Sequence, residues 1–322
     1  MQEIFFTCKE EKIRLDHFLT KEMQSSRNQI IELIRLGNVQ VNDKAITKAG
    51  YKLNIDDILC VKLNSTKKDE NREFEVDFDV PIIYEDDDIL VINKPPFLTV
   101  HPAPSVKELT LVDWLKSKNI SLSTLSGEER YGIVHRIDKE TSGALVIAKN
   151  NASHIFLSKQ LEDKTMGRYY LGLIDKELKN DVIVEKPIAR NPKNRTKMAI
   201  VQDGREAKSA FFSLLKAKQF ELILAKLYTG RTHQIRVHLN SIGRHILGDD
   251  LYGFKSQNDK INRVMLHAYC LYLTHPKSKQ NMTFIAPLYG DFREILDKNF
   301  NKEDIDETLK IDTIFSRINT IC

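Results

Sequence analysis

A strongly polar stretch early in the chain divides it into two parts that we expect to fold separately. Residues 63–76 read Leu-Asn-Ser-Thr-Lys-Lys-Asp-Glu-Asn-Arg-Glu-Phe-Glu-Val, and such a run buries too little apolar surface to join a core. The sequence therefore predicts a small N-terminal unit over residues 1–62, a linker over 63–76, a larger unit over 77–300 and a tail over 301–322. With 41% hydrophobic residues, the 322-residue chain has enough apolar side chains for two cores.

The N-terminal unit combines two helical patterns with short strands. Apolar residues recur at helical spacing in residues 13–19 and again in residues 30–34. Gly37 stands where a helix C-cap glycine belongs, and residues 39–41 alternate as a strand does. A further short strand is predicted near residues 53–58. The pattern indicates a small α/β unit.

This unit resembles an S4 RNA-binding domain over residues 14–16, 26–27 and 33–42. The resemblance implies that the second helix and its following loop lie against RNA backbone. The matching basic positions are Arg27, Arg35, Lys44 and Lys48. Residues 12–62 hold nine Lys and Arg against six Asp and Glu, so charge alone equally fits a solvated surface.

The larger unit mixes strands and helices without strict alternation. Strands are predicted over residues 89–92, 144–148, 169–174 and 220–228. Helices are predicted to follow caps at Thr110, Asn151 and Thr232. This order favours an α+β domain with a mixed, mostly antiparallel sheet and flanking helices. The charged tail over 301–322 is expected to form one helix, docked or loose.

The densest chemical signal lies in residues 132–145, which read Gly-Ile-Val-His-Arg-Ile-Asp-Lys-Glu-Thr-Ser-Gly-Ala-Leu. A turn rich in reactive side chains directly precedes an apolar strand, and rigid scaffolds often display functional groups in this way. From the residues alone, Asp138 fits a nucleophile, a general base, a metal ligand or a residue that forms the turn.

Two later segments carry similar signals. Residues 168–174 read Arg-Tyr-Tyr-Leu-Gly-Leu-Ile, and residues 227–239 read Leu-Tyr-Thr-Gly-Arg-Thr-His-Gln-Ile-Arg-Val-His-Leu. His233 and His238 are five positions apart, whereas two ligands on one helical face are usually four apart. We therefore expect both histidines to make structural hydrogen bonds, and we expect no metal site.

In order along the chain, these three segments resemble the catalytic motifs of the RluA family of pseudouridine synthases. The resemblance implies that Asp138 is the catalytic aspartate, that Tyr170 is the active-site tyrosine and that Arg231 pairs with the aspartate. A nearby guanidinium favours the charged form of a carboxylate, as a nucleophile requires.

The same resemblance implies further substrate contacts and includes some departures. His135, Arg136 and Thr141 are expected to bind the RNA substrate, with Arg136 holding the RNA while the target base is flipped out. Arg168 replaces the family's usual Lys, and Phe97 stands where the family often has Gly or a smaller residue.

The resemblance implies an enzyme that isomerises uridine to pseudouridine through an aspartate nucleophile. Residues 187–190 and 195–199 resemble the branch that acts on 23S large-subunit ribosomal RNA. The reaction has no redox change, so we expect no cofactor and no metal. We expect RNA as the partner and a monomeric protein. Three alternatives stay open: a synthase acting on transfer RNA, a non-catalytic S4-type ribosome-binding protein, and a glycoside hydrolase. The hydrolase is disfavoured because that chemistry normally needs two carboxylates.

The remaining features indicate a cytoplasmic protein. The four cysteines are scattered, with no CxxC pair, which predicts reduced thiols without disulfides or structural zinc. They are Cys8, Cys60, Cys270 and Cys322. Residues 1–7 lack the pattern of a signal peptide, and no apolar run approaches the ~20 residues that cross a bilayer. The formal net charge of +4 only weakly favours an anionic partner.

Overall fold

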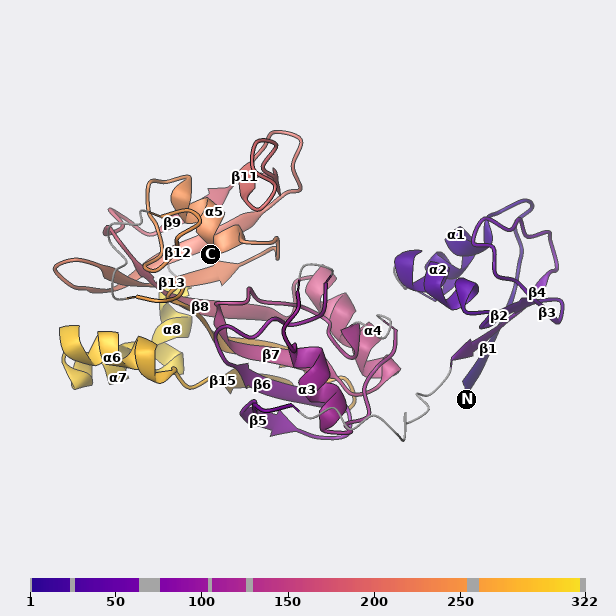
Figure 1. Cartoon of the computed structure of the whole chain (residues 1–322), viewed down its shortest axis with the longest axis horizontal. Helices are drawn as coiled ribbons and strands as arrows, with labels where there is room; N and C mark the ends of the chain where they lie inside the picture. The colour runs from indigo at the N-terminus through magenta and orange to yellow at the C-terminus, as the bar shows by residue number, and fades with distance from the viewer. Residues whose placement is uncertain are drawn as a thin grey trace.

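A computed structural model describes residues 2–23, 27–63, 76–103, 106–125, 130–253 and 261–318. Figure 1 shows a small N-terminal unit and a larger unit built on a long sheet. Each unit has its own buried apolar cluster. The predicted linker over 63–76 lies almost entirely outside the described residues.

The N-terminal unit packs two helices on one face of a four-stranded antiparallel sheet with strand order β1-β4-β2-β3. Its elements are β1 (Gln2–Thr7), α1 (Leu15–Glu22), α2 (Arg27–Arg35), β2 (Val39–Val41), β3 (Lys44–Ala45) and β4 (Ile58–Leu63). The helices bury Leu15, Leu19, Ile30 and Ile34 completely. Gly37 has φ +74°, the left-handed conformation expected of the helix C-cap glycine.

Two strands of this unit differ from the prediction. The strand predicted near residues 53–58 instead runs from Ile58 to Leu63, because Asp56, with φ +67°, turns the chain just before it. The strand β1 was not predicted at all. Its residues alternate between exposed and half-buried, so its pattern carries no strong apolar face.

The larger unit is built on a nine-stranded sheet with strand order β5-β6-β7-β14-β8-β13-β12-β9, to which β15 adds beside β14. Its strands are β5 (Ile82–Glu85), β6 (Ile89–Lys94), β7 (Ser142–Ala148), β8 (Gly167–Ile174), β9 (Val182–Glu185), β12 (Lys208–Lys216), β13 (Glu221–Leu227), β14 (Leu266–Thr274) and β15 (Asn281–Ile285). A separate hairpin joins β10 (Ile188–Arg190) and β11 (Met198–Ile200). The pairings are antiparallel except for β7 with β14, so the expected mixed, mostly antiparallel sheet is confirmed.

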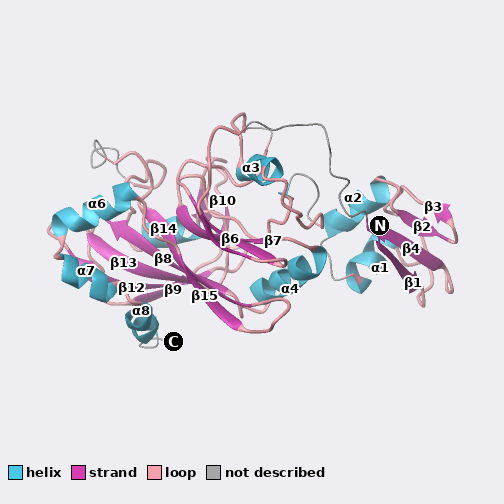
Figure 2. Cartoon of the chain, turned by 90° about the horizontal axis from the view of Figure 1, so that it is seen from below, coloured by secondary structure: helices cyan, strands magenta, loops and turns pink. Residues whose placement is uncertain are grey.

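Both faces of the central strands are buried, which explains their continuous apolar runs. Leu90 and Ile92 of β6 point into one core, and Ile89 and Val91 point into another. In Figure 2, α3 (Leu111–Ser117) lies above β6 and β7, and α4 (Asn151–Glu162) lies below them. Each helix therefore closes one of the two cores.

The helix starts confirm one predicted cap and correct two. Thr110 caps α3 through a capping box with Asp113, as its sequence predicts. The cap of α4 is Asn150 rather than Asn151, because the Asn150 side chain accepts from the backbone N–H of Ser153. The helix predicted to follow Thr232 is α5 (Gln234–Asn240), which starts after His233 at φ +54°.

The chain ends in three helices that pack against the sheet at the β12–β13 end, α6 (Gly290–Asn299), α7 (Lys302–Thr308) and α8 (Ile311–Ile318). The predicted tail is thus two docked helices, α7 and α8, and not one. Ile305, Ile314 and Ile318 join the main core, and Tyr269 donates to the carbonyl oxygen of Leu309 at 2.8 Å. Among the described residues, no helix is both long and apolar enough to cross a membrane.

Candidate active site

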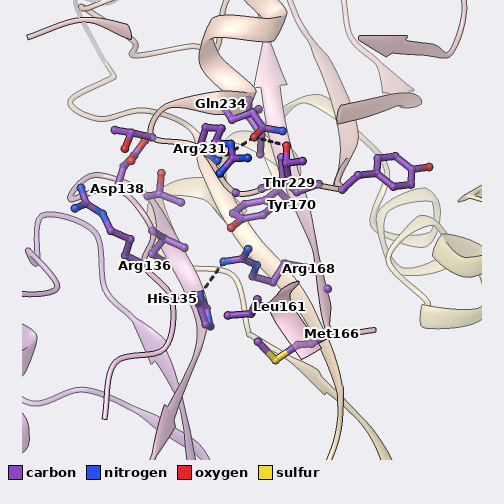
Figure 3. A pocket seen from close by; sticks show the side chains of 18 of the residues that line it. His135, Arg136, Asp138, Leu161, Met166, Arg168, Tyr170, Thr229, Arg231 and Gln234 are labelled. Carbon is purple, nitrogen blue, oxygen red and sulfur yellow. Dashed lines mark hydrogen bonds between the residues drawn. The ribbon is translucent and has the colours of Figure 1, made fainter. Parts of the chain in front are cut away.

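The three segments singled out in the sequence surround one cavity of about 620 Å³. One wall is the loop before β7, the floor is β8, and the facing wall is the turn from β13 into α5 (Figure 3). Among the described residues that line the cavity, seven are basic and two are acidic, Asp138 and Glu162. The basic ones are Arg130, Arg136, Lys164, Arg168, Lys226, Arg231 and Arg236. This excess of positive charge suits an anionic ligand.

Asp138 lies at the wall of this cavity with 20% of its side chain exposed. Its carboxylate Oδ2 lies 3.5 Å from Nη1 of Arg236. Within the described parts of the chain, this ion pair is the carboxylate's one polar contact, and it accepts no hydrogen bond there. The remaining lone pairs of Asp138 therefore face the cavity and can act on a ligand.

The structure corrects the identity of the arginine that pairs with Asp138. Arg231 lines the same cavity, but its Nε donates to the carbonyl oxygen of Glu206 at 3.0 Å. The pairing falls to Arg236, five residues later on α5. The predicted pair Asp138–Arg231 is therefore wrong, because the turn at His233 carries Arg231 away from the aspartate and α5 brings Arg236 beneath it.

Arg236 is held in place by a second carboxylate. Its Nε and Nη2 each donate to Asp249 at 2.7 Å, a bidentate geometry that fixes the guanidinium plane. Burial opposes the charge of Arg236, but the carboxylates of Asp249 and Asp138 outweigh it and raise the pKa of Arg236 above its usual value. The ring of Tyr252 covers the guanidinium at 5.1 Å.

The loop that carries Asp138 is anchored by a buried lysine. Lys94, at the end of β6, donates from Nζ to the carbonyl oxygens of Pro95 at 2.7 Å, Leu98 at 2.9 Å and Lys139 at 3.0 Å. Burial lowers the pKa of Lys94 to about 7, although the charge of Asp138 works in the other direction. The bond to Lys139 fixes the backbone immediately after the aspartate.

The other end of the loop is anchored to β14. Ser142 Oγ lies 2.8 Å from Nδ1 of His267, whose Nε2 donates to the carbonyl oxygen of Ala286 at 3.0 Å. Gly143 has φ +114°, and a Cβ there would lie 2.3 Å from the carbonyl oxygen of Ala268. Only glycine allows this approach, so the Thr-Ser-Gly portion of the motif serves the parallel pairing of β7 with β14.

The floor of the cavity comes from alternate residues of β8. Tyr170 and Arg168 both line the cavity, as residues two apart on a strand share a face. Tyr170 is 4% exposed, and burial raises the pKa of its hydroxyl. In Figure 3, Tyr170 lies below Arg231, Arg168 lies below Tyr170, and Asp138 lies to their left.

The predicted substrate-binding residues of the loop differ in accessibility. Arg136 is exposed at the cavity. His135 is buried, where its ring contacts Arg168 and the backbone N–H of Val146. Thr141 also lines the cavity, and its hydroxyl is buried without a hydrogen-bond partner among the described residues.

The four predicted contacts of the S4 unit are all exposed, but one is engaged inside the unit. Arg27 donates from Nε and Nη2 to Asp16 at 3.0 and 2.9 Å, and Arg14 pairs with the same carboxylate. The hydrogen bonds from Arg14 outweigh burial and, with Arg27, lower the pKa of Asp16 to about 2. Arg35, Lys44 and Lys48 remain on the surface.

Sequence reasoning missed Arg236, Lys94 and His267 as parts of this site. Each is charged or polar and more than nine-tenths buried, a condition that residue type alone does not indicate. Lys94 had a signal, since it ends an apolar run directly before two prolines. The structural roles expected for His233 and His238 are confirmed, as His233 contacts the Tyr252 hydroxyl at 2.9 Å and His238 contacts Ser209 Oγ at 3.0 Å.

One group of side chains has the composition of a metal site, but its atoms are already used. Ligand atoms of Asp86, Asp88 and His275 lie within 4.8 Å of one another. The Nδ1 of His275 accepts from the backbone N–H groups of Lys277 and Ser278, so its Nε2 carries the proton donated to Asp86 at 2.8 Å. The histidine therefore has no lone pair left for an ion. Asp86 and His275 instead form hydrogen bonds with each other and with the backbone of two turns.

Comparisons with known proteins agree with this geometry. The family model for RNA pseudouridylate synthases matches residues 88–241, and the S4 domain model matches residues 13–59. An uncharacterised RNA pseudouridine synthase of Helicobacter pylori (strain J99) is 48% identical over 96% of both chains. Ribosomal large subunit pseudouridine synthase D of Nitrosomonas europaea is 37% identical over 88% of this chain and 83% of its own.

A solved structure shares the fold. Human RNA pseudouridylate synthase domain containing 1 superposes with a TM-score of 0.57 at 22% identity, covering 72% of this chain and 95% of its own. The expected resemblances to the S4 domain and to the synthase family are thus confirmed. The chain belongs to the family of RNA pseudouridine synthases, which isomerise uridine in RNA.

Proposed function

We propose that this protein converts specific uridines of 23S large-subunit ribosomal RNA to pseudouridine, with Asp138 as the nucleophile on a flipped-out uridine. The observation that carries this proposal is the state of Asp138. Its carboxylate borders the cavity, is balanced by Arg236, and accepts no hydrogen bond from the described residues.

The arrangement suits the reaction that the proposal assigns. Isomerisation breaks the bond from N1 to C1′, turns the base and rejoins it through C5, so no electrons and no atoms are gained or lost. The proposal therefore uses one carboxylate, and no cofactor is assigned. A paired uridine must first leave its stack, at a cost of a few kcal/mol. In this proposal Arg136, which is exposed at the cavity, fills the vacated space, and Tyr170, which also lines the cavity, stacks on the base.

The choice of ribosomal RNA rests on relatives. Proteins of Nitrosomonas europaea and Zymomonas mobilis, 37% and 36% identical to this chain, are named ribosomal large subunit pseudouridine synthase D. The S4 unit supports binding to a structured RNA. Transfer RNA is the alternative substrate and is tested in the same experiment.

The test is to map pseudouridines in ribosomal and transfer RNA from cells with and without the gene. We expect one or more positions of 23S RNA to lose the modification in the deletion strain. The wild-type gene should restore them, and a gene with Asp138→Asn should not, although that variant should still bind RNA.

Asp203→Asn is the matched control, because Asp203 is an exposed carboxylate outside the cavity lining. It should restore the modification fully. If pseudouridine were lost only from transfer RNA, the substrate would be transfer RNA and not ribosomal RNA. An unchanged map in both RNAs would overturn the proposal. Substantial product from Asp138→Asn would exclude the nucleophilic role while leaving the substrate intact.

A further inference from the structure

Arg168 is a buried cation without a counter-ion among the described residues. The residue is 8% exposed and lies on the cavity floor. No carboxylate of the described chain lies within 4.0 Å of its guanidinium, whereas Arg236 and Arg263, which are buried at least as deeply, each pair with aspartate. Its Nε is buried without a hydrogen-bond partner among the described residues. A buried charge is normally paired, so this position lacks the group that would balance it.

The one hydrogen bond of its side chain in the described chain does not supply that balance. Nη1 of Arg168 lies 2.8 Å from Nδ1 of His135. Burial, and then the charge of Arg168, lower the pKa of His135 well below its usual value, so the ring is neutral. A neutral imidazole offers one acceptor nitrogen, yet the backbone N–H of Val146 also points at its Nε2, at 3.2 Å. The ring therefore satisfies one of two donors and carries no negative charge.

The backbone opposite Arg168 leaves room beside the guanidinium. Gly230 lies in the turn after β13, and a Cβ added there would lie 3.4 Å from Nη2 of Arg168. The glycine therefore keeps that side of the guanidinium clear of side-chain atoms. In Figure 3, Arg168 lies below Tyr170 and Asp138 lies to the upper left of both, so a ligand that reaches both Asp138 and Arg168 lies alongside the tyrosine.

We propose that Arg168 binds a backbone phosphate of the RNA, next to the nucleotide whose base lies against Tyr170. A phosphate supplies the missing negative charge and accepts from Nη2, the atom that has space beside it, while Nη1 stays with His135. A uracil carbonyl would accept a hydrogen bond but would leave the buried charge uncompensated. The inference deepens the proposed function, on which it rests, by assigning a part of the substrate to a residue outside the Asp138–Arg236 pair.

The test uses the full chain and an RNA oligonucleotide that spans a uridine identified by the mapping. In a series, each phosphate near that uridine is replaced singly by an uncharged methylphosphonate. For the wild-type protein, one substituted linkage should weaken binding about tenfold, the size of a hydrogen bond to a charged group. Arg168→Gln should bind unmodified RNA about tenfold more weakly and should lose its sensitivity to that linkage.

Salt dependence gives a second readout that a purely structural role would not move. The slope of log K against log salt should fall by about 0.7 in Arg168→Gln, the value for one released counter-ion on a single strand. Arg168→Lys keeps the charge and should keep the slope. Gly230→Ala leaves every charge in place but puts a methyl group in van der Waals contact with Nη2, where the phosphate would lie, and it should raise the Kd while the melting temperature stays near that of wild type.

The outcomes separate the two proposals. An active wild-type enzyme whose Arg168→Gln variant keeps the slope and its sensitivity to every linkage overturns the phosphate site alone. If Arg168→Gln does not fold, the wild-type linkage series and Gly230→Ala provide the test. The phosphate site is overturned if no single linkage weakens wild-type binding and Gly230→Ala binds as tightly as wild type. A wild-type protein that modifies no RNA overturns the proposed function and this inference with it.

Discussion

Arg236 holds two carboxylates with one guanidinium, and the two have different surroundings. Asp249 is 1% exposed and also accepts from the backbone N–H groups of Leu251 and Tyr252, whereas Asp138 has the arginine as its one polar partner in the described chain. Asp249 therefore fixes the position of the guanidinium, which forms an ion pair with Asp138. Such a fixed charge favours an ionised aspartate without needing to move during the reaction.

Removing Arg236 should damage both stability and turnover. Arg236→Gln leaves Asp249 buried without its cation, which should cost about 3 kcal/mol and lower Tm by roughly 6–12 °C. Turnover of the folded fraction should fall by more than about 100-fold. Thermal unfolding and single-turnover rates measure the two effects.

Arg231→Gln is the matched control for that variant. It gives up a bond to a backbone carbonyl and should cost less than about 1 kcal/mol. A greater loss of turnover in Arg231→Gln than in Arg236→Gln, at equal folded fraction, would contradict the assigned pairing.

Lys94 should act on turnover through the backbone of Lys139. Lys94→Met leaves three carbonyl oxygens without a donor, and we expect kcat to fall at least tenfold with little change in RNA affinity. Lys139→Ala is the control, because its side chain forms only a surface pair with Glu108 while its carbonyl stays in place. Equal kcat values for the two variants would remove the positioning role.

The same lysine predicts a dependence of stability on pH. Its pKa is about 7 in the folded chain and 10.5 as the ordinary value, so between these pH values the unfolded chain binds more protons. Stability from this group therefore rises with pH across that window, by up to about 1.4 kcal/mol per pH unit. Denaturant titrations from pH 7 to 10 should show a smaller rise in Lys94→Met than in wild type, and parallel curves would contradict this.

At the scale of single residues, motif order predicted more than chemistry alone did. Asp138 and Tyr170 were placed at one cavity by the resemblance, because their segments keep the family's order. The partner arginine was misassigned since two arginines five apart lie in one motif, and the left-handed turn at His233 between them decides which faces the aspartate. The identity of a residue such as His233 does not predict that its backbone adopts the left-handed conformation.

The loop after β6 contains a residue in an unfavourable conformation. Phe97 has φ +65° and is 50% exposed, so it gains little burial in return for the strain. Phe97→Gly should therefore stabilise the protein by about 1 kcal/mol and raise Tm by roughly 2–4 °C. Phe97→Ala removes the ring but keeps the strain and should give no such gain. A melting temperature for the glycine variant at or below that of the alanine variant would refute this account.

At the scale of elements, strands with continuous apolar runs were predictable and half-exposed elements were not. Residues 89–92 and 144–148 lie within β6 and β7 because both faces of these strands are covered. The described residues of β1 are exposed or half-buried, α7 has one apolar residue, and the apolar side of α8 is buried only by its neighbours. That information depends on distant contacts, such as Ile314 with the main core.

For the whole molecule, the separate cores predict that the two units can be divided. A chain lacking residues 1–75 should keep a cooperative thermal transition but bind RNA more weakly and with a smaller salt slope. In the full chain, the combined change of Arg35, Lys44 and Lys48 to Ala should lower the slope in the same direction without altering Tm by more than about 2 °C. Filter binding at several salt concentrations measures both, and wild-type affinity in the triple variant would contradict an S4 contact at these positions.

The position of β14 in the middle of the sheet has a consequence for synthesis on the ribosome. The S4 unit is complete once Leu63 has emerged, but β14, which anchors the Asp138 loop through His267, begins only at Leu266. At about 5–20 residues per second, at least ten seconds separate the two events. During that interval the edges of β7 and β8 that later pair with β14 are unpaired. The S4 unit of the nascent chain can already bind RNA. Each new molecule can thus bind RNA through its S4 unit before its candidate active site is complete.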